Sequence, residues 1–228
     1  MAKSYISLMK IVTWNIERLP FSKKENITAV LAKFDADIII LTETKEVLDY
    51  GRNMHKTSTI LLPNFYDGQQ YSAGENRVTL LSKYPIAKTY VTKDAYTSIC
   101  ADVLTPIGPL RIYGTITGVF GGIGNRFISD LEGQLEDFDS LLAGSNCCIA
   151  GDLNTFFSGY AYPSHKARNV FNYSFQKLNL KNLTADLKDN VDHIIISESF
   201  IKDRKIKISI FNEDKSLSDH IGICAEIL

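Results

Sequence analysis

Two predicted helices, each associated with short apolar runs, restrict the fold more than any other feature of the sequence. Residues 24–35 separate the runs 9–15 and 38–41, and residues 126–143 precede the run 147–150. Apolar side chains recur in them at helical spacing: Ile27, Val30, Leu31 and Phe34 in the first, and Ile128, Leu131, Leu135, Phe138 and Leu142 in the second. A helix between two strands is the usual crossover between parallel strands. The sequence therefore predicts an α/β protein.

The remaining apolar runs have the length and composition of strands. They cover residues 56–62, 77–83, 86–92, 96–104, 109–117, 191–196, 205–211 and 221–228. A third helical stretch ends at about residue 178. The polar, aromatic segment 63–76 and the glycine-rich segment 118–125 are candidate loops at the rim of a site. The glycine-rich segment lacks the Gly-Lys-Ser/Thr of a phosphate-binding loop, so a nucleotide cradle is not predicted there.

The composition indicates one globular domain. No linker divides the 228 residues, so we interpret 1–228 as a single domain, with residues 1–8 as a possible extension. A hydrophobic content of 45% is sufficient for a full core. A formal charge of -1 means that the protein has no overall positive charge with which to bind a polyanion. The four cysteines show neither disulfide nor zinc spacing. Without a run of 18 apolar residues or a secretion signal, we expect a monomeric cytoplasmic protein with no membrane span.

Polar residues stand at the ends of the predicted strands. Asp152 and Asn154 directly follow the run 147–150, and Gly151 is expected to let the backbone turn sharply there. An ionised Asp can take a proton from water or hold a hard cation, although Asp and Asn are also ordinary turn residues. The interpretation gains weight from similar residues at the ends of other strands: Asn15, Glu43, Asp192, Asp219 and His220.

These groups meet at one edge if the C-terminal strands run antiparallel to the N-terminal ones. Four carboxylates would then share a cleft, those of Glu43, Asp152, Asp192 and Asp219. They would repel one another unless a cation joined them. Oxygen ligands without a set of His and Cys favour magnesium or manganese over zinc. The residues therefore predict a hard divalent cation.

Five short motifs that contain these residues resemble, in order, those of the endonuclease/exonuclease/phosphatase superfamily. They are Thr13-Trp14-Asn15-Ile16-Glu17, Leu41-Thr42-Glu43-Thr44-Lys45, Gly151-Asp152-Leu153-Asn154, Val191-Asp192-His193-Ile194 and Ser218-Asp219-His220. Residues 79–86 also resemble a framework strand of that superfamily, so the resemblance covers nearly the whole chain. It implies a four-layered α/β sandwich, with two mixed sheets packed face to face and helices outside, and magnesium-dependent cleavage of phosphate esters.

The resemblance implies roles for the residues that bind the metal, the attacking water and the phosphate. Glu43 would be a metal ligand, and Asn15 and Asp219 would be auxiliary groups that bind the metal or orient the phosphate. Asp152 would activate the attacking water. Asn154 would hold a nonbridging oxygen of the phosphate.

The resemblance also separates the two histidines of the last motifs. His220 would donate to the phosphate as negative charge builds on it, and Asp192 would fix the orientation of its ring. His193 should face away from Asp192 if that stretch is extended, so we interpret it as structural.

Two departures from the superfamily pattern bear on substrate. Many members carry a histidine on the strand equivalent to 111–117, and here Tyr113, a threonine or a water held by the metal would take its task. Glu17 and Lys45 fit the abasic-site endonuclease version of the first two motifs. Trp14, however, is the only tryptophan and lies inside a motif, so an aromatic pocket for an abasic sugar is not evident.

The leading functional hypothesis is a nuclease-like phosphodiesterase that acts on DNA or RNA. Lys45 and Arg168 would contact the substrate, together with Lys166 and Tyr113. The neutral net charge favours the alternative, a phosphoesterase for a small-molecule or lipid-headgroup phosphate. A third class is a binding protein that kept the fold and lost the chemistry, and the intact acidic motifs argue against it.

Overall fold

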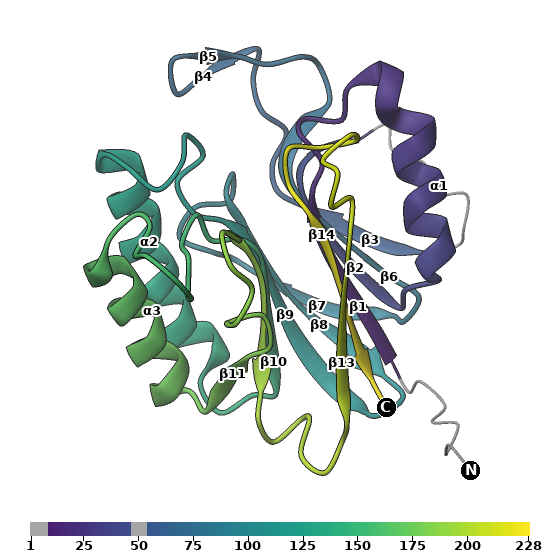
Figure 1. Cartoon of the computed structure of the whole chain (residues 1–228), viewed down its shortest axis with the longest axis vertical. Coiled ribbons are helices and arrows are strands. Elements are labelled where there is room, and N and C mark those ends of the chain that lie inside the picture. Colours follow the sequence, from purple (N-terminus) through teal and green to yellow (C-terminus); the bar gives the residue numbers. More distant parts are fainter. Residues whose placement is uncertain (1–8, 47–53) are drawn as a thin grey trace.

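The protein is a four-layered α/β sandwich. The computed structural model describes residues 9–46 and 54–228, and the possible extension at residues 1–8 lies outside them. Two six-stranded sheets pack face to face, with helix α1 outside one sheet and helices α2 and α3 outside the other (Figure 1). This is the architecture that the resemblance implied. No helix in the described part of the chain has the length and apolar character needed to cross a membrane.

The first sheet is built from both ends of the chain. Its strands, in spatial order, are β13 (Ile206–Phe211), β14 (Gly222–Ile227), β1 (Met9–Asn15), β2 (Ile38–Lys45), β6 (Glu75–Ser82) and β3 (His55–Ser58). Strands β1 and β2 are parallel and are joined by α1 (Lys24–Phe34), which follows the 3-10 turn η1 (Phe21–Lys23). Strand β14 runs antiparallel to β1. The predicted crossover and the predicted direction of the last strand are therefore both confirmed.

The second sheet comes from the middle of the chain. Its strands, in spatial order, are β11 (Leu180–Asn182), β12 (Asp192–Ser197), β10 (Cys147–Asp152), β9 (Gly108–Ile116), β8 (Ser98–Thr105) and β7 (Ile86–Tyr90). Strands β9 and β10 are parallel, with α2 (Asn125–Asp137) and the π-helical turn η2 (Phe138–Leu142) between them. Helix α3 (His165–Lys177) lies beside α2, and β12 runs antiparallel to β10 (Figure 1).

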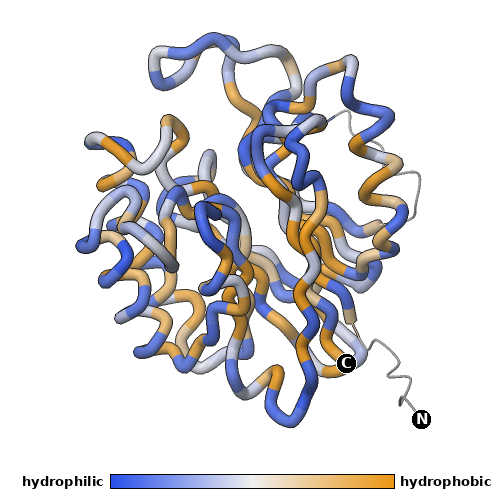
Figure 2. The backbone as a smooth tube through the Cα atoms, in the orientation of Figure 1, coloured by the Kyte–Doolittle hydropathy of each residue, from blue (hydrophilic) through white to orange (hydrophobic). Residues whose placement is uncertain are grey.

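Three apolar cores hold the layers together. The central core takes residues from both sheets, for example Ile40 and Ile112, and the two outer cores lie under α1 and under α2 and α3. Because the inner strands are covered on both faces, their sequences are apolar runs and do not alternate with polar residues. Figure 2 shows these hydrophobic positions along the packed strands.

The structure differs from the predictions at several boundaries. The strand predicted at 56–62 ends at Ser58, and a hairpin of β4 (Phe65–Tyr66) and β5 (Gln69–Gln70) follows. The predicted helix 126–143 changes to π-helical geometry at Phe138. The predicted sharp turn at Gly151 was wrong, because β10 continues to Asp152. Glycine is nevertheless required there, because Gly151 has a φ of +137° and a Cβ atom on it would lie 2.0 Å from the Thr115 carbonyl oxygen of the neighbouring strand β9.

Candidate active site

The predicted acidic residues, with Asn15 and His220, meet at one end of the sandwich, where the two sheets face each other. Asn15 ends β1 and Asp152 ends β10, so each sheet supplies one of them. The Asn15 amide Nδ2 donates to Glu43 Oε1 and to Asp152 Oδ2, both at 3.2 Å. Its Oδ1 accepts the backbone N–H of Glu17 at 3.0 Å. Asn15 therefore holds two carboxylates from different sheets at a fixed separation.

Glu43 lies within β2 in a backbone conformation that strands rarely adopt. Its φ is +50°, while its neighbours Thr42 and Thr44 keep their pairing with β6. A non-glycine residue in the left-handed region inside a strand is costly, and such strained residues cluster at functional sites. Burial also raises the pKa of Glu43. The surrounding structure therefore holds this carboxylate at the site despite an unfavourable backbone conformation and an unfavourable burial of charge.

Asp152 is a buried carboxylate with both oxygens engaged. Its Oδ1 accepts the backbone N–H of Asn154 at 2.9 Å, and its Oδ2 accepts from Asn15. Burial, and next the nearby charge of Asp192, raise the pKa of Asp152 to about 7. A general base is most effective when its pKa is close to the working pH. Asp152 is therefore well suited to take a proton from water.

His220 and Asp192 form an ion pair beside Asp152. His220 Nδ1 lies 2.6 Å from Asp192 Oδ2, and its Nε2 lies 3.8 Å from Asp219 Oδ1. Burial disfavours the protonated ring, but the charges of Asp192, Asp152 and Asp219 outweigh burial and raise the pKa of His220 to about 10. The ring is therefore an imidazolium at neutral pH, with its second N–H available as a donor.

Two residues whose role the sequence did not reveal hold the His220 loop against β1. Trp14 Nε1 donates to the His220 carbonyl at 3.1 Å. Ser218 Oγ donates to the Asn15 carbonyl at 2.7 Å and accepts the His220 N–H at 3.2 Å. The only signal for these contacts was that Trp14 and Ser218 lie inside the motifs themselves.

The predicted role of Asn154 as a donor to the phosphate is wrong for this geometry. Its φ is +44°, and its Nδ2 donates to the carbonyls of Thr117 and Gly118 at 3.0 and 2.9 Å. Both amide protons are therefore committed to the backbone of the glycine-rich loop. Because only the N–H₂ side can face two carbonyls, the side chain is left with Oδ1, an acceptor.

The prediction that Tyr113 binds substrate is also wrong. Its ring is fully buried in the core under α2, and its hydroxyl donates to Asp137 Oδ2 at 2.7 Å. On the same strand and just beyond it, the hydroxyls of Thr115 and Thr117 bond to the Thr97 carbonyl and to Gln134. None of these hydroxyls replaces the strand histidine.

Arg168 has structural partners in place of the predicted substrate. Its guanidinium donates to the carbonyls of Phe156, Ser158, Gly159 and Tyr160. These residues belong to the loop that follows Asn154, so Arg168 braces that loop against α3. Most of the guanidinium is therefore committed to the loop, and only one N–H, on Nη1, has no acceptor among these carbonyls.

Arg168→Ala is therefore expected to lower the free energy of unfolding by about 1–2 kcal/mol, because hydrogen bonds from a charged donor are lost. Chemical denaturation would measure the change. Lys166→Ala on the exposed face of the same helix is the matched control and should be close to neutral. Equal stability of the two variants would contradict the bracing role.

Lys45 lies near Glu43 and has a carboxylate counterion. Its Nζ is 3.7 Å from Glu75 Oε1, and Arg18 Nε is 2.7 Å from the other oxygen of the same carboxylate. The Glu75 side chain is only 3% exposed, so it forms a buried counterion for two cations. The positive charge of Lys45 is therefore partly balanced by Glu75, and its contact with substrate stays a prediction.

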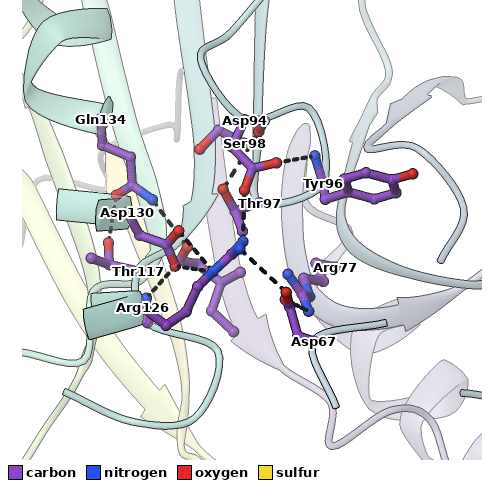
Figure 3. A network of polar contacts seen from close by, with 12 residues as sticks. Asp67, Arg77, Asp94, Tyr96, Thr97, Ser98, Thr117, Arg126, Asp130 and Gln134 are labelled. Carbon is purple, nitrogen blue, oxygen red and sulfur yellow. Dashed lines mark hydrogen bonds and ion pairs between the residues drawn. The ribbon is translucent and has the colours of Figure 1, made fainter. Parts of the chain in front are cut away.

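A network of charged side chains contacts the glycine-rich loop where that loop leads into α2 (Figure 3). Arg126 of α2 forms ion pairs with three carboxylates, those of Asp67, Asp94 and Asp130. Asp67 also pairs with Arg77 of β6 at 2.9 Å, and Asp130 accepts the Gly118 N–H at 2.9 Å. The network connects α2 to the first sheet and fixes the loop carbonyls that hold Asn154.

His193 has structural partners, as the sequence predicted. It is fully buried, its Nδ1 lies 2.8 Å from Thr184 Oγ1, and its Nε2 lies 3.0 Å from the Thr155 carbonyl. Burial lowers the pKa of His193 to about 4, so the ring is neutral at physiological pH. The side chain contributes no charge to the site.

The donor set of the site fits a hard cation. In the described ranges, no three His, Cys, Asp or Glu side chains are close enough to form a ready-made metal cluster. The site nevertheless holds an excess of carboxylates, and the buried Oδ1 of Asp192 has no hydrogen-bond partner among the described residues. Burial raises the pKa values of Glu43 and Asp152, as expected for carboxylates that lack a full counter-charge.

A two-sheet α/β sandwich with an acidic, oxygen-rich site at one end is the arrangement expected for the superfamily that the sequence motifs resemble. The chain belongs to the Endonuclease/Exonuclease/phosphatase family, whose model matches residues 12–220. A search of the curated proteins by sequence gave no significant match.

Solved structures share this fold. An endonuclease/exonuclease/phosphatase from Beutenbergia cavernae is 15% identical, with a TM-score of 0.71 over 96% of this chain and 71% of that one. A 3'-5' exonuclease from Neisseria meningitidis is 16% identical, with a TM-score of 0.67 over 96% and 99%. An AP endonuclease from Archaeoglobus fulgidus is 14% identical, with a TM-score of 0.67 over 95% and 98%.

Proposed function

We propose that this protein is a magnesium- or manganese-dependent phosphodiesterase that cleaves nucleic acid. The observation that carries the proposal is the presence of a buried base, Asp152, and a half-buried imidazolium, His220, at one site. General-base removal of a proton from water and donation to a developing oxyanion are the two requirements of phosphate ester hydrolysis that a protein can meet directly.

Each side chain has a defined task in this reaction. Asp152 takes one proton from the attacking water. Asn154 Oδ1 can accept a hydrogen bond from the other O–H of that water. His220 donates Nε2–H to a phosphate oxygen, while Asp192 holds the ring through Nδ1. Glu43, with Asn15 and Asp219 as auxiliary groups, would hold the cation. A bound magnesium or manganese ion would neutralise charge on the phosphate and polarise its oxygens.

Two observations support a nucleic-acid substrate. The similar structures from Neisseria meningitidis and Archaeoglobus fulgidus are described as an exonuclease and an AP endonuclease. In this chain, Lys188 and Lys215 line the hollow of about 450 Å³ that also contains His220. Lysines near the reacting group can contact neighbouring phosphates of a polymer.

The partners of Lys45 and Arg168 favour the second candidate, a phosphoesterase for a small molecule. One cation is paired with Glu75 and the other with backbone carbonyls, so neither extends a basic track. A small substrate needs no such track. An assay of purified protein with DNA, RNA, an abasic oligonucleotide, phosphoinositides and bis(p-nitrophenyl) phosphate separates the two candidates.

In that assay we expect hydrolysis of the polymers and of the aryl diester with magnesium or manganese, and loss of both in EDTA. Full activity in chelator would contradict the metal dependence. Cleavage restricted to phosphoinositides or to the aryl diester would favour the small-molecule candidate.

Glu43→Gln should raise the magnesium concentration for half-maximal rate by about tenfold, because an amide is a weaker ligand for a hard cation than a carboxylate. A magnesium titration measures the change. Glu17→Gln is the matched control, since Glu17 is partly exposed and pairs with Lys23. Identical titrations for Glu43→Gln and the unmodified protein would remove Glu43 from the metal site.

A further inference from the structure

A cavity of about 170 Å³ has the candidate metal ligand Glu43 in its wall. Strands β2 and β6, the segment after β5 and the glycine-rich loop supply the rest of the wall, including Thr44, Tyr71, Asn76, Arg77 and Phe120. A group bound in this cavity would therefore lie next to the phosphate site. Nothing in the mechanism above uses these residues.

The cavity wall contains polar atoms that the protein leaves unsatisfied. Thr44 Oγ1, Asn76 Oδ1 and Arg77 Nη1 each expose less than 1 Å², so they lie beneath the cavity surface, and they have no hydrogen-bond partner within the described part of the chain. The Asn76 Nδ2 donates to the Val78 carbonyl and to Thr79 Oγ1, so its free atom is the carbonyl oxygen. Buried unsatisfied atoms are costly, so small side-chain rotations that let these residues bond to a polar group in the cavity would be favourable.

The charges of the wall exclude a phosphate as that polar group. The positive charges of Arg18 and Arg77 are matched by the negative charges of Glu43 and Glu75, which also line the cavity. Arg18 is paired with Glu75 at 2.7 Å, and Arg77 is paired with Asp67 at 2.9 Å. An anion would meet two carboxylates and no free cation. The cavity therefore suits a neutral group that carries both donors and acceptors.

The size and the aromatic lining indicate a planar ring. A cavity of ~150 Å³ is large enough for benzene, so this one can hold a single ring. The guanidinium groups of Arg18 and Arg77 lie over the Tyr71 ring, 4.8 and 5.8 Å from its centroid, so the half-exposed Phe120 is the aromatic ring that a base can stack on. Aromatic side chains are the surfaces on which unpaired bases stack.

We propose that this cavity receives a nucleobase of the nucleotide whose phosphate is cleaved. Arg77 would donate to a ring or carbonyl acceptor, Asn76 would accept from an amino or imino group, and Thr44 can do either. This inference rests on the proposed function and deepens it: the substrate is an unpaired nucleotide chain, because only an unstacked base can enter.

Substrate preference tests the inference. The p-nitrophenyl esters of thymidine 3'-phosphate and thymidine 5'-phosphate carry a base on either side of the phosphate, and methyl p-nitrophenyl phosphate carries no base and no second ring. We expect at least one nucleoside ester to be cleaved with a kcat/KM about 10-fold above that of the base-free diester. Equal values for all three would overturn the nucleobase cavity and leave the proposed function intact.

Two threonine variants give a matched pair. Thr44→Val and Thr13→Val each remove a buried hydroxyl without a partner in the described structure, but only Thr44 lines the cavity. Thr44→Val should lower kcat/KM for the preferred nucleoside ester about 5-fold and leave the base-free diester unchanged. Thr13→Val should change neither, and unchanged preference in Thr44→Val would overturn the proposal. Thermal melting shows whether both variants are folded.

Phe120→Ala provides a second variant at an exposed position where folding is not at risk. It should lower the preference for the nucleoside ester through loss of stacking.

If no diester is hydrolysed, equilibrium dialysis of free nucleosides still decides the question. Binding that is weakened in Thr44→Val and kept in Thr13→Val would support the cavity although the proposed function had failed. Absence of binding to the unmodified protein would show that the cavity holds only water.

Discussion

Replacing Asp152 with asparagine is expected to lower turnover by about 100-fold or more, the range expected for loss of a general base. The amide has nearly the same shape as the carboxylate but cannot take a proton from water. Its effect on stability should be small, because relief of a buried charge offsets the loss of the hydrogen bond that Asn15 donates. Single-turnover rates at saturating magnesium and substrate would measure the chemical step directly.

The control for this variant is Asp137→Asn. Asp137 is equally buried, but it accepts from Tyr113 and from the Lys93 backbone in the core under α2. Its replacement should leave turnover unchanged. Near-normal turnover in Asp152→Asn would contradict the assignment of Asp152 as the base.

His220→Ala should lower turnover by about 100-fold, the size of effect seen when a preorganised donor to a developing oxyanion is removed. Asp192→Asn should act in the same direction, because the ring loses its 2.6 Å partner and its fixed orientation. The two residues act as one unit, so the double variant should be little slower than His220→Ala alone.

Exposed His165, at the start of α3, is the matched control for this series, and His165→Ala should be neutral. Additive losses for His220 and Asp192 would show that Asp192 has a separate task. A His220→Ala variant with normal turnover would leave the imidazolium without a role in catalysis.

The positions of the site residues could be predicted because strand ends are visible in the sequence. The apolar runs end at Asn15 and near Asp152, and the crossover helices fix the direction of those strands. The resemblance then supplied the pairing of His220 with Asp192, which the 2.6 Å contact confirms. That Asn15 joins Glu43 and Asp152 across two sheets was not visible, because hydrogen bonds between sheets follow no sequence spacing.

The predictions that failed concerned the direction of a side chain or its competing partners. Tyr113 lies on the face of β9 that packs under α2, and a shift of one residue in register would have turned it towards the other sheet. Arg168 lies close to Asn154 in the sequence, but its guanidinium donates to backbone carbonyls of the irregular loop between them. The backbone partners of Asn154 also come from a loop whose path the sequence does not define.

The order in which the sheets are assembled along the chain has a consequence for biosynthesis. Asn15 and Glu43 leave the ribosome early, and Asp152 and Asp192 follow, yet β14 must pair with β1 before the Trp14 indole can reach the His220 carbonyl. That pairing joins residues separated by roughly the whole chain and belongs to the slowest class of folding event. A growing chain therefore carries most of its catalytic groups in an inactive form. We expect hydrolytic activity only after the last strand has been synthesised and has closed the first sheet.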